Sequence, residues 1–184
     1  MKRRGFLYNS TICISCCACQ VACQSTKGLR PDEYFRRVVI RSKEGSQGIP
    51  FSGGCNHCAK PACVAACPTG AMYRDEEAGV VLHDDGRCIG CGACVWNCPY
   101  GAVSLSATTG VSQKCDSCIQ LRRQGLQPAC VAACPMGALR YDGPVPVEVE
   151  RPWRQLQANF LPSPTETNPS TFAWFAEEEE DGHA

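Results

Sequence analysis

The chain has 184 residues, with 18 basic and 18 acidic side chains, and a formal net charge of 0. This length predicts one compact domain or two small ones, and no apolar run approaches the ~18 residues of a membrane-spanning helix. The 17 cysteines would suit a small disulfide scaffold. Cysteines three residues apart do not easily bridge one another, however, and the number is odd, so the composition argues against such a scaffold.

The first predicted element is a strand at Gly5–Tyr8. Arg3 and Arg4 before it look like a twin-arginine export signal, but no apolar segment follows before the first cysteine. Basic residues ahead of a strand are therefore the favoured interpretation. Residues 35–40 are rich in β-branched side chains and predict a second strand, whereas residues 46–54 predict a loop.

Sixteen of the cysteines fall into four groups of four, which we call quartets one to four. The quartets, in order, are Cys13, Cys16, Cys19 and Cys23; Cys55, Cys58, Cys63 and Cys67; Cys88, Cys91, Cys94 and Cys98; and Cys115, Cys118, Cys130 and Cys134. Quartet three has the spacing C-x2-C-x2-C-x3-C-P, the bacterial ferredoxin pattern for a [4Fe–4S] cubane. The sixteen cysteines are therefore predicted to be the iron ligands of four [4Fe–4S] clusters.

Two properties of the quartets bear on other functions. Zinc sites use paired C-x2-C knuckles separated by a longer loop, whereas most of these quartets crowd their thiols into a short stretch, so zinc is disfavoured. Thiolate-bound cubanes would add negative charge to a chain whose formal net charge is 0, so nucleic-acid binding is disfavoured as well.

The quartets belong to an internal repeat. The eight residues 61–68 reappear letter for letter at 128–135, and the ending C-P-x-G-A occurs three times. Each unit is interpreted as a loop, a short helix and a strand, with the strands at Met72-Tyr73, Val103–Leu105 and Leu139–Tyr141. The fourth cysteine is expected on the short helix, facing away from the cluster of its own loop, and therefore ligates the other cluster of a pair.

Three further segments complete the chain. Residues 80–82 predict a strand, and residues 119–126 predict a small helical insertion in quartet four. From Pro144 onward the frequent prolines and the acidic run at 177–181 predict no independent fold. Because the aromatic side chains of this tail are costly to leave in water, an extended arm docked on a partner is favoured over a disordered tail.

The ordered spacings of all four quartets, with the local sequences Phe35-Arg36-Arg37-Val38 and Cys55-Asn56-His57-Cys58, resemble one family. This is the four-cluster electron-transfer subunit of molybdopterin oxidoreductases of the dimethyl sulfoxide reductase type. The resemblance covers about residues 5–142. Polysulfide, tetrathionate, nitrite-linked, formate and hydrogenase subunits share the cysteine plan, and the sequence around Cys55 leans toward the sulfoxide reductase branch.

The resemblance implies an α+β fold of two bacterial-ferredoxin-like double-cluster domains, one nested in the other. The implied segments are an outer domain at 5–30 plus 111–142, a connecting segment at 31–54, an inner domain at 55–110 and an extended partner-binding tail at 143–184. The implied ligand sets exchange the fourth cysteine within each pair of quartets. They are Cys13, Cys16 and Cys19 with Cys134; Cys115, Cys118 and Cys130 with Cys23; Cys55, Cys58 and Cys63 with Cys98; and Cys88, Cys91 and Cys94 with Cys67.

Four residues in or beside the quartets have features that the cysteine spacing does not explain. Cys23 is followed by Gln24 rather than by proline, so its helix end is less well defined. Cys17 is the extra cysteine and is interpreted as a non-ligand, because Cys16 alone fits the spacing. His57 and Lys114 lie beside predicted ligands. His57 could couple a proton to cluster reduction and Lys114 could raise a potential, but a surface or hydrogen-bonding role is the more common one for such residues.

The function implied is that of a non-catalytic subunit. It would relay single electrons between a membrane quinol-linked anchor subunit and a large molybdopterin catalytic subunit in anaerobic respiration. Association with the membrane through these partners, on the periplasmic side, is expected. The alternatives are a polyferredoxin subunit of a hydrogenase, formate-linked or tungsten aldehyde oxidoreductase complex, and an iron–sulfur redox sensor, although the chain has no room for a signal-binding module. Because cluster binding would supply folding free energy, the apo chain is expected not to fold stably.

Overall fold

The computed structural model describes residues 5–41, 48–142, 154–155 and 161–174. Its strands are β1 (Gly5–Asn9), β2 (Arg36–Arg41), β3 (Ile49–Gly54), β4 (Met72–Asp75), β5 (Val80–His83), β6 (Val103–Leu105), β7 (Ser112–Lys114), β8 (Leu139–Asp142), β9 (Arg154–Gln155) and β10 (Phe172–Trp174). Its α-helices are α1 (Ala18–Lys27), α2 (Ala62–Ala65), α3 (Ala93–Trp96), α4 (Ile119–Arg123), α5 (Ala129–Ala132) and α6 (Pro164–Thr167). Two short 3-10 turns, η1 (Ser10–Ile12) and η2 (Asp85–Arg87), precede quartets one and three.

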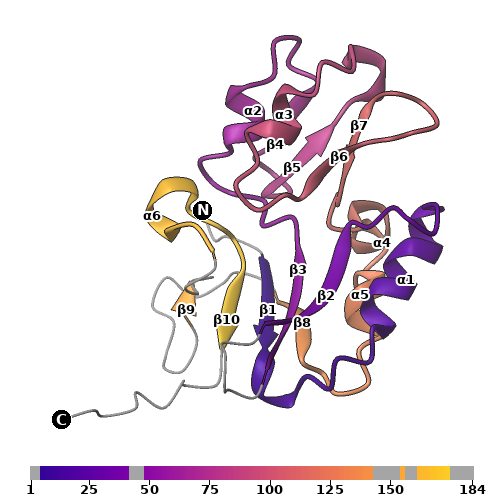
Figure 1. Cartoon of the computed structure of the whole chain (residues 1–184), viewed down its shortest axis with the longest axis vertical. Helices are drawn as coiled ribbons and strands as arrows, with labels where there is room; N and C mark the ends of the chain where they lie inside the picture. The colour runs from indigo at the N-terminus through magenta and orange to yellow at the C-terminus, as the bar shows by residue number, and fades with distance from the viewer. Residues whose placement is uncertain (1–4, 42–47, 143–153, 156–160, 175–184) are drawn as a thin grey trace.

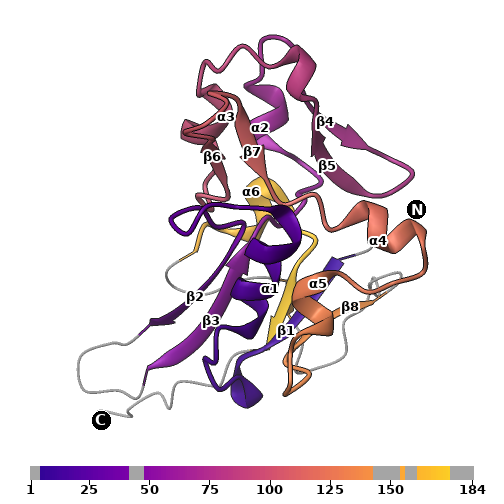
Figure 2. The same ribbon diagram turned by 90° about the vertical axis from the view of Figure 1, so that its right-hand side faces the viewer.

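The elements form two parts that follow one another along the long axis of the molecule (Figures 1 and 2). The upper part contains α2, α3 and the hairpins β4–β5 and β6–β7. The lower part brings elements from both ends of the chain together, because β1 pairs with β8 and α1 packs against α5. In the upper part the equivalent helix contact is between α2 and α3. The helices that follow quartets one and four thus meet each other, as do those of quartets two and three.

The larger sheet has the strand order β8-β1-β10-β9. β1 is antiparallel to β8, with Phe6 opposite Tyr141, and parallel to β10, with Tyr8 opposite Ala173. Because side chains alternate along a strand, Phe6 and Tyr8 share one face. Both are buried, in a core that also contains Leu139, Ala173 and four cysteines of quartets one and four, Cys13, Cys19, Cys130 and Cys134.

The upper part has a small core of its own. Met72, Val81, Cys94 and Val103 are its buried residues, and Val64, Val95 and further cysteines pack against it. Thiols therefore make up a substantial part of both cores, and purely aliphatic contacts are few. Such cores bury little apolar surface for their size, so the folded state needs another source of free energy.

Most strand predictions are confirmed, and one loop prediction is wrong. The segments predicted at Gly5–Tyr8, 35–40, 80–82 and after the three C-P-x-G-A endings are all strands, with bounds that differ by one or two residues. The predicted loop at 46–54 instead contains β3, which pairs along its whole length with β2, from Arg36 opposite Gly54 to Arg41 opposite Ile49. Pro50, Gly53 and Gly54 disguise this strand in the sequence, because proline and glycine are rare inside strands. Residues 46 and 47 lie outside the described residues.

Glycines at the end of β3 have a packing role. A Cβ at Gly53 would approach the Phe51 ring to 2.7 Å, and one at Gly54 would lie 3.2 Å from the carbonyl oxygen of Phe35. A larger side chain at Gly53 would collide with the Phe51 ring, and one at Gly54 would crowd the backbone of the paired strand segment, so both positions favour glycine. The predicted helical insertion at 119–126 is confirmed in a shorter form, because α4 ends at Arg123 and Gly125 has a φ of 76°.

The described part of the C-terminal tail lies on the rest of the same polypeptide. The hydroxyl of Ser170 donates to the carbonyl of His57 at 3.0 Å, and the backbone N–H of Ser170 donates to the carbonyl of Asn56. The carbonyls of Thr167 and Asn168 accept from the N–H groups of Lys60 and Ala59. Residues 161–174 thus satisfy polar backbone groups of the quartet-two loop, and the docking of the tail on a partner stays a prediction. The acidic run at 177–181 lies outside the described residues, as do Arg3 and Arg4.

Candidate metal centres

All four cysteine loops share one backbone feature. The residue immediately before the second cysteine of each quartet has a positive φ: 55° at Ser15, 43° at His57, 68° at Gly90 and 59° at Ser117. Of these four residues only Gly90 adopts this region without steric cost, because the other three carry side chains that disfavour it. The same left-handed turn at equivalent positions shows that the four quartets fold as four copies of one loop.

Backbone N–H groups point at several of the thiols. The N–H of Met72 donates to the sulfur of Cys67 at 3.4 Å, and the N–H of Ala102 donates to the sulfur of Cys98 at 3.3 Å. The N–H of Ser117 donates to the sulfur of Cys115 at 3.3 Å, and the N–H of Ser112 donates to the sulfur of Cys88 at 3.5 Å. Hydrogen bonds to sulfur favour the thiolate, the form that binds metal. At Cys88, where burial alone would raise the pKa, the hydroxyl and N–H of Ser112 lower it to about 6.

The thiols of quartets one and four lie close to one another. Burial, together with the charges of Cys130 and Cys118, raises the pKa of Cys23 to about 12. Burial likewise raises the pKa of Cys19, with Cys130 and Cys134 adding to the effect. Cys13, Cys19 and Cys134 also pack against the same core as Cys130. Thiols separated by more than 100 residues in sequence therefore meet in the lower part.

Quartets two and three meet in the same way. Burial raises the pKa of Cys63 to about 12, and the charges of Cys55, Cys98 and Cys58 contribute. Cys63, Cys67, Cys94 and Cys98 pack in one core. Two predicted ligands, Cys16 and Cys91, are exposed, and the other fourteen are buried or half-buried.

The two groups of thiols approach each other at one place. Burial raises the pKa of Cys115, and the charge of Cys55 is the next largest cause. Cys115 belongs to quartet four in the lower part and Cys55 to quartet two in the upper part. Thiols of the two parts therefore interact electrostatically, so that a series of interacting thiols extends through both parts.

The donor set fits iron–sulfur clusters. All 17 cysteines are free thiols, and none forms a disulfide. Among the described residues, no group of three or more His, Cys, Asp or Glu side chains is spaced to hold a single metal ion. A cubane binds its four thiolates at separate irons, so its ligands do not converge on one point. The metal-free thiols have raised pKa values mainly because they are buried, and bound iron would favour their ionisation.

Cys17 occupies the position that glycine holds in quartet three. Cys17 and Gly92 both follow the second cysteine, have φ values of 60° and 74°, and form the N-cap of the helix that follows. The Cys17 thiol donates to the carbonyl of Ser15 at 3.5 Å, beside its own loop. This position supports the interpretation of Cys17 as a residue that shapes the loop.

His57 and Lys114 are both buried rather than on the surface. The Nδ1 of His57 accepts the N–H of Val81 at 3.1 Å, and burial, with the charges of Lys114 and Arg122, holds the pKa of the imidazole well below its ordinary value. The Nζ of Lys114 donates to the carbonyls of Val81 and Cys115. Lys114 thereby connects β5 to the quartet-four loop, and its charge lies near Cys63.

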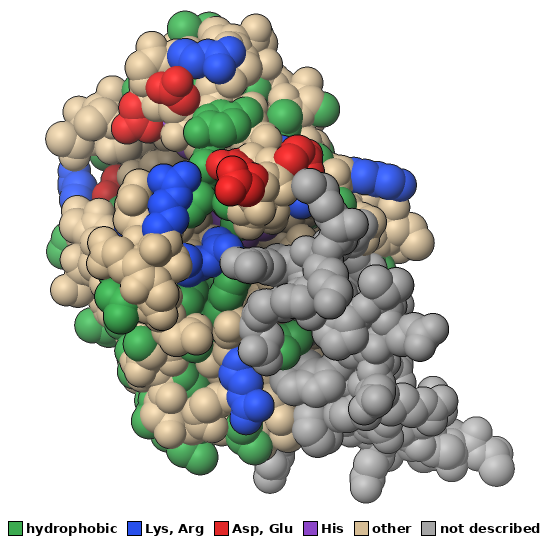
Figure 3. All heavy atoms as spheres, turned by 180° about the vertical axis from the view of Figure 1, so that it is seen from behind, with side chains coloured by type: hydrophobic (Ala, Val, Ile, Leu, Met, Phe, Trp, Pro, Cys, Tyr) green, Lys and Arg blue, Asp and Glu red, His purple; other side chains and the backbone are tan. Residues whose placement is uncertain are grey.

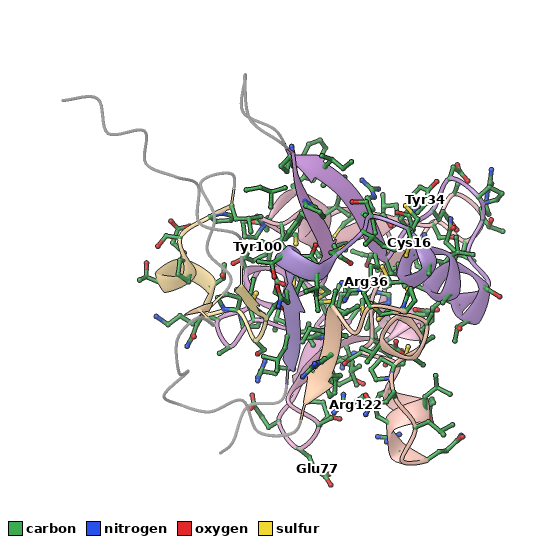
Figure 4. The ribbon with its side chains drawn as sticks, turned by 90° about the horizontal axis from the view of Figure 1, so that it is seen from below. Cys16, Tyr34, Arg36, Glu77, Tyr100 and Arg122 are labelled. Atoms are coloured by element: carbon green, nitrogen blue, oxygen red, sulfur yellow. The ribbon has the colours of Figure 1, made fainter. Side chains whose placement is uncertain are left out.

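Sequence reasoning missed Arg36 as a functional residue. Its side chain is only 5% exposed, and its Nη1 donates to the carbonyl of Ser52 at 3.0 Å and to the hydroxyl of Ser52 at 3.2 Å. Its guanidinium lies 4.8 Å from the centre of the Phe6 ring. Figure 4 shows Arg36 among the side chains in the middle of the view, whereas Glu77 lies at the edge. The sequence does show two adjacent arginines in a predicted strand. Because neighbouring side chains on a strand point to opposite faces, this pair could have indicated that one arginine faces inward.

The face of the molecule seen in Figure 3 carries charges of both signs. On this face, the described Lys and Arg side chains are interspersed with Asp and Glu. In the part of the chain that the structure describes, no helix has the length and apolar character needed to cross a bilayer.

Comparisons with known proteins identify iron–sulfur relatives of this chain. A family model described as a 4Fe-4S dicluster domain matches residues 46–143. The probable anaerobic dimethyl sulfoxide reductase subunit YnfG of Escherichia coli (strain K12) is 39% identical over 152 residues, which cover 77% of this chain and 73% of the relative. The B subunit of the anaerobic dimethyl sulfoxide reductase of the same strain is 38% identical with the same coverage. The thiosulfate reductase electron transfer subunit PhsB of Salmonella typhi is 40% identical over 154 residues, 79% of this chain and 78% of the relative.

Proposed function

This protein belongs to the iron–sulfur electron-transfer subunits of the dimethyl sulfoxide reductase type, and from that premise we propose that it is a four-cluster electron relay of an anaerobic respiratory complex. It would pass single electrons between a membrane quinol-linked anchor subunit and a molybdopterin catalytic subunit, and would itself catalyse no substrate reaction. Each bound [4Fe–4S] cluster would supply a reversible one-electron change.

The proposed clusters use the sixteen cysteines in exchanged sets. Cluster A is held by Cys13, Cys16, Cys19 and Cys134; cluster B by Cys115, Cys118, Cys130 and Cys23; cluster C by Cys55, Cys58, Cys63 and Cys98; and cluster D by Cys88, Cys91, Cys94 and Cys67. The exchange is supported by the charges that act on Cys23, Cys19 and Cys63, which include those of their proposed distant partners. It corresponds to two nested double-cluster domains.

The observation that carries the proposal is the series of thiols through both parts. Cys19 and Cys130 link clusters A and B, Cys115 and Cys55 link clusters B and C, and the core of the upper part joins the thiols of clusters C and D. The proposed order is therefore A, B, C, D. The two exposed ligands, Cys16 and Cys91, belong to clusters A and D at the two ends of this order, where electrons would enter and leave.

Exposed apolar side chains lie near the two end clusters of this order, A and D. Near cluster D they are Ile89, Trp96 and Leu105, and near cluster A they are Ile14, Val21 and Met136. Trp96 is 87% exposed, although tryptophan is highly buried on average. Exposed apolar groups of this kind support a partner subunit at each end. We place the complex at the periplasmic face of the membrane.

Anaerobic affinity purification of the protein from its own cells, followed by metal analysis, tests the proposal. About 16 iron atoms per chain, four for each of four clusters, are expected with molybdenum and a large co-purifying subunit. Tungsten or nickel in place of molybdenum would move the protein to an aldehyde-oxidising or hydrogenase complex. Zinc with little iron would contradict the cluster assignment.

A further inference from the structure

The guanidinium of Arg36 is buried inside the lower part of the molecule. It enters from β2, where the neighbouring Arg37 points outward and is exposed. Ser52 on the paired strand β3 fixes the guanidinium through its carbonyl and hydroxyl oxygens. The Ser52 hydroxyl also lies 3.5 Å from the Cys19 sulfur, a proposed ligand of cluster A.

Arg36 lacks a carboxylate partner in the described part of the chain, where the ion pairs join other residues. A buried cation without a counter-charge is costly, so negative groups must compensate it. With clusters bound, the thiolates of the nearby cysteines would supply this negative charge. Although burial acts to lower it, the charges of Cys130, Cys115, Cys19 and Cys23 raise the pKa of Arg36 above its ordinary value.

These four thiols come from two proposed clusters. Cys19 is a ligand of cluster A, and Cys130, Cys115 and Cys23 are ligands of cluster B. Reduction adds one negative charge to a cluster, and a nearby fixed positive charge stabilises that added charge. Because Arg36 is buried, water and salt screen this attraction only weakly.

Resting on the proposed function, we propose that Arg36 is a fixed cation between clusters A and B that raises the reduction potentials of both. It acts through its permanent charge and supplies no ligand to iron. The thiols that act most strongly on Arg36 belong to clusters A and B, so the potentials of clusters C and D should depend on this charge much less.

The test is an EPR-monitored redox titration of the complex, purified anaerobically with its partner subunits. In Arg36→Gln the ratio of reduced to oxidised cluster at a fixed potential should fall at least tenfold for two of the four clusters. For a one-electron couple this corresponds to a shift of about 59 mV to lower potential. The other two clusters should keep their midpoints.

Arg37→Gln is the matched control. It removes the same charge from the next residue of the same strand, where Arg37 is exposed and lies 5.5 Å from the Tyr34 ring centre. All four midpoints should stay within a threefold change in that ratio. Equal shifts in both variants would overturn the proposal, because they would reflect overall charge rather than the buried position.

Two further variants distinguish an effect on the reduction potentials from an effect on folding. Arg36→Met keeps the apolar contact with Phe6 and should lower the same two potentials. Arg36→Lys keeps the charge but moves it, and should produce smaller shifts in the same two clusters. If the neutral variants do not assemble, Arg36→Lys decides: because it keeps the positive charge, a tenfold fall in the ratio of reduced to oxidised cluster A or B in this variant would overturn the proposal.

The iron content keeps this inference distinct from the proposed function. Wild-type complex with four clusters and an Arg36→Gln variant with unchanged midpoints would overturn the role of Arg36 alone. Wild-type complex without four clusters would overturn the proposed function, whatever the variants do.

Discussion

The Nζ of Lys27 lies 2.6 Å from the Oδ1 of Asp116, across 89 residues of sequence. Lys27 is at the end of α1, after quartet one, and Asp116 is in the loop of quartet four, where its Oδ1 also accepts the N–H of Cys118 at 3.0 Å. The ion pair therefore connects segments from the two ends of the sequence at the proposed cluster B. Its side chains are 22% and 30% exposed, so solvent screens it less than a fully exposed pair.

Removing this pair should loosen the lower part. Lys27→Ala is expected to reduce the free energy of unfolding of the cluster-loaded protein by about 1 kcal/mol, because Asp116 loses its counter-charge. Anaerobic denaturant titration, followed by cluster absorbance, measures the change. Arg30→Ala is the control, since the pair of Arg30 with Asp32 is 53% and 69% exposed and should contribute much less. Equal effects of the two variants would contradict the role of the Lys27–Asp116 pair.

The contact between Ser170 and His57 predicts that the C-terminal segment protects cluster C. Ser170→Ala removes the hydroxyl that donates to the His57 carbonyl, a buried bond worth about 1 kcal/mol. We expect faster loss of iron to a chelator from the variant, because the quartet-two loop is less well held. Thr165→Ala, at an exposed position of α6, serves as the control. Identical rates for wild type and Ser170→Ala would show that the segment does not protect the cluster.

Cys17→Ser should leave the iron content unchanged. The serine hydroxyl can donate to the Ser15 carbonyl, as the Cys17 thiol does now, and the residue supplies no ligand in the proposed sets. Cys16→Ser should remove or convert cluster A, because it takes away one of four ligands. Iron analysis and EPR of the two variants distinguish them. Loss of a cluster signal in Cys17→Ser would make Cys17 a ligand.

Removal of iron should unfold the protein. Both cores rely on cysteines, and the aliphatic residues between them are few. Without clusters these cores lose the free energy that metal binding supplies. Anaerobic chelation is expected to abolish protection against a protease and most of the far-ultraviolet circular dichroism. A chelated protein that kept both signals would show that the polypeptide folds without clusters.

The repeat allowed many local elements to be predicted. The strands β1, β2, β4, β5, β6 and β8 and the helix α4 were predicted because β-branched, glycine and proline patterns are local signals. β3 was not, because Pro50, Gly53 and Gly54 are turn signals when read locally, and only pairing with β2 makes the segment a strand. Tertiary contacts override local propensity most easily where that propensity is weak.

The sequence by itself determined the chemistry of the site, since the spacing of the sixteen thiols depends only on the order of residues along the polypeptide. The tertiary structure decided which thiols from distant quartets approach one another, such as Cys115 and Cys55. It also decided which of two adjacent arginines is buried among those thiols. The physical reason is that burial and electrostatic interaction depend on distances through space. Arg36 comes near Cys19 and the thiols of quartet four only when both ends of the sequence have folded around β2 and β3.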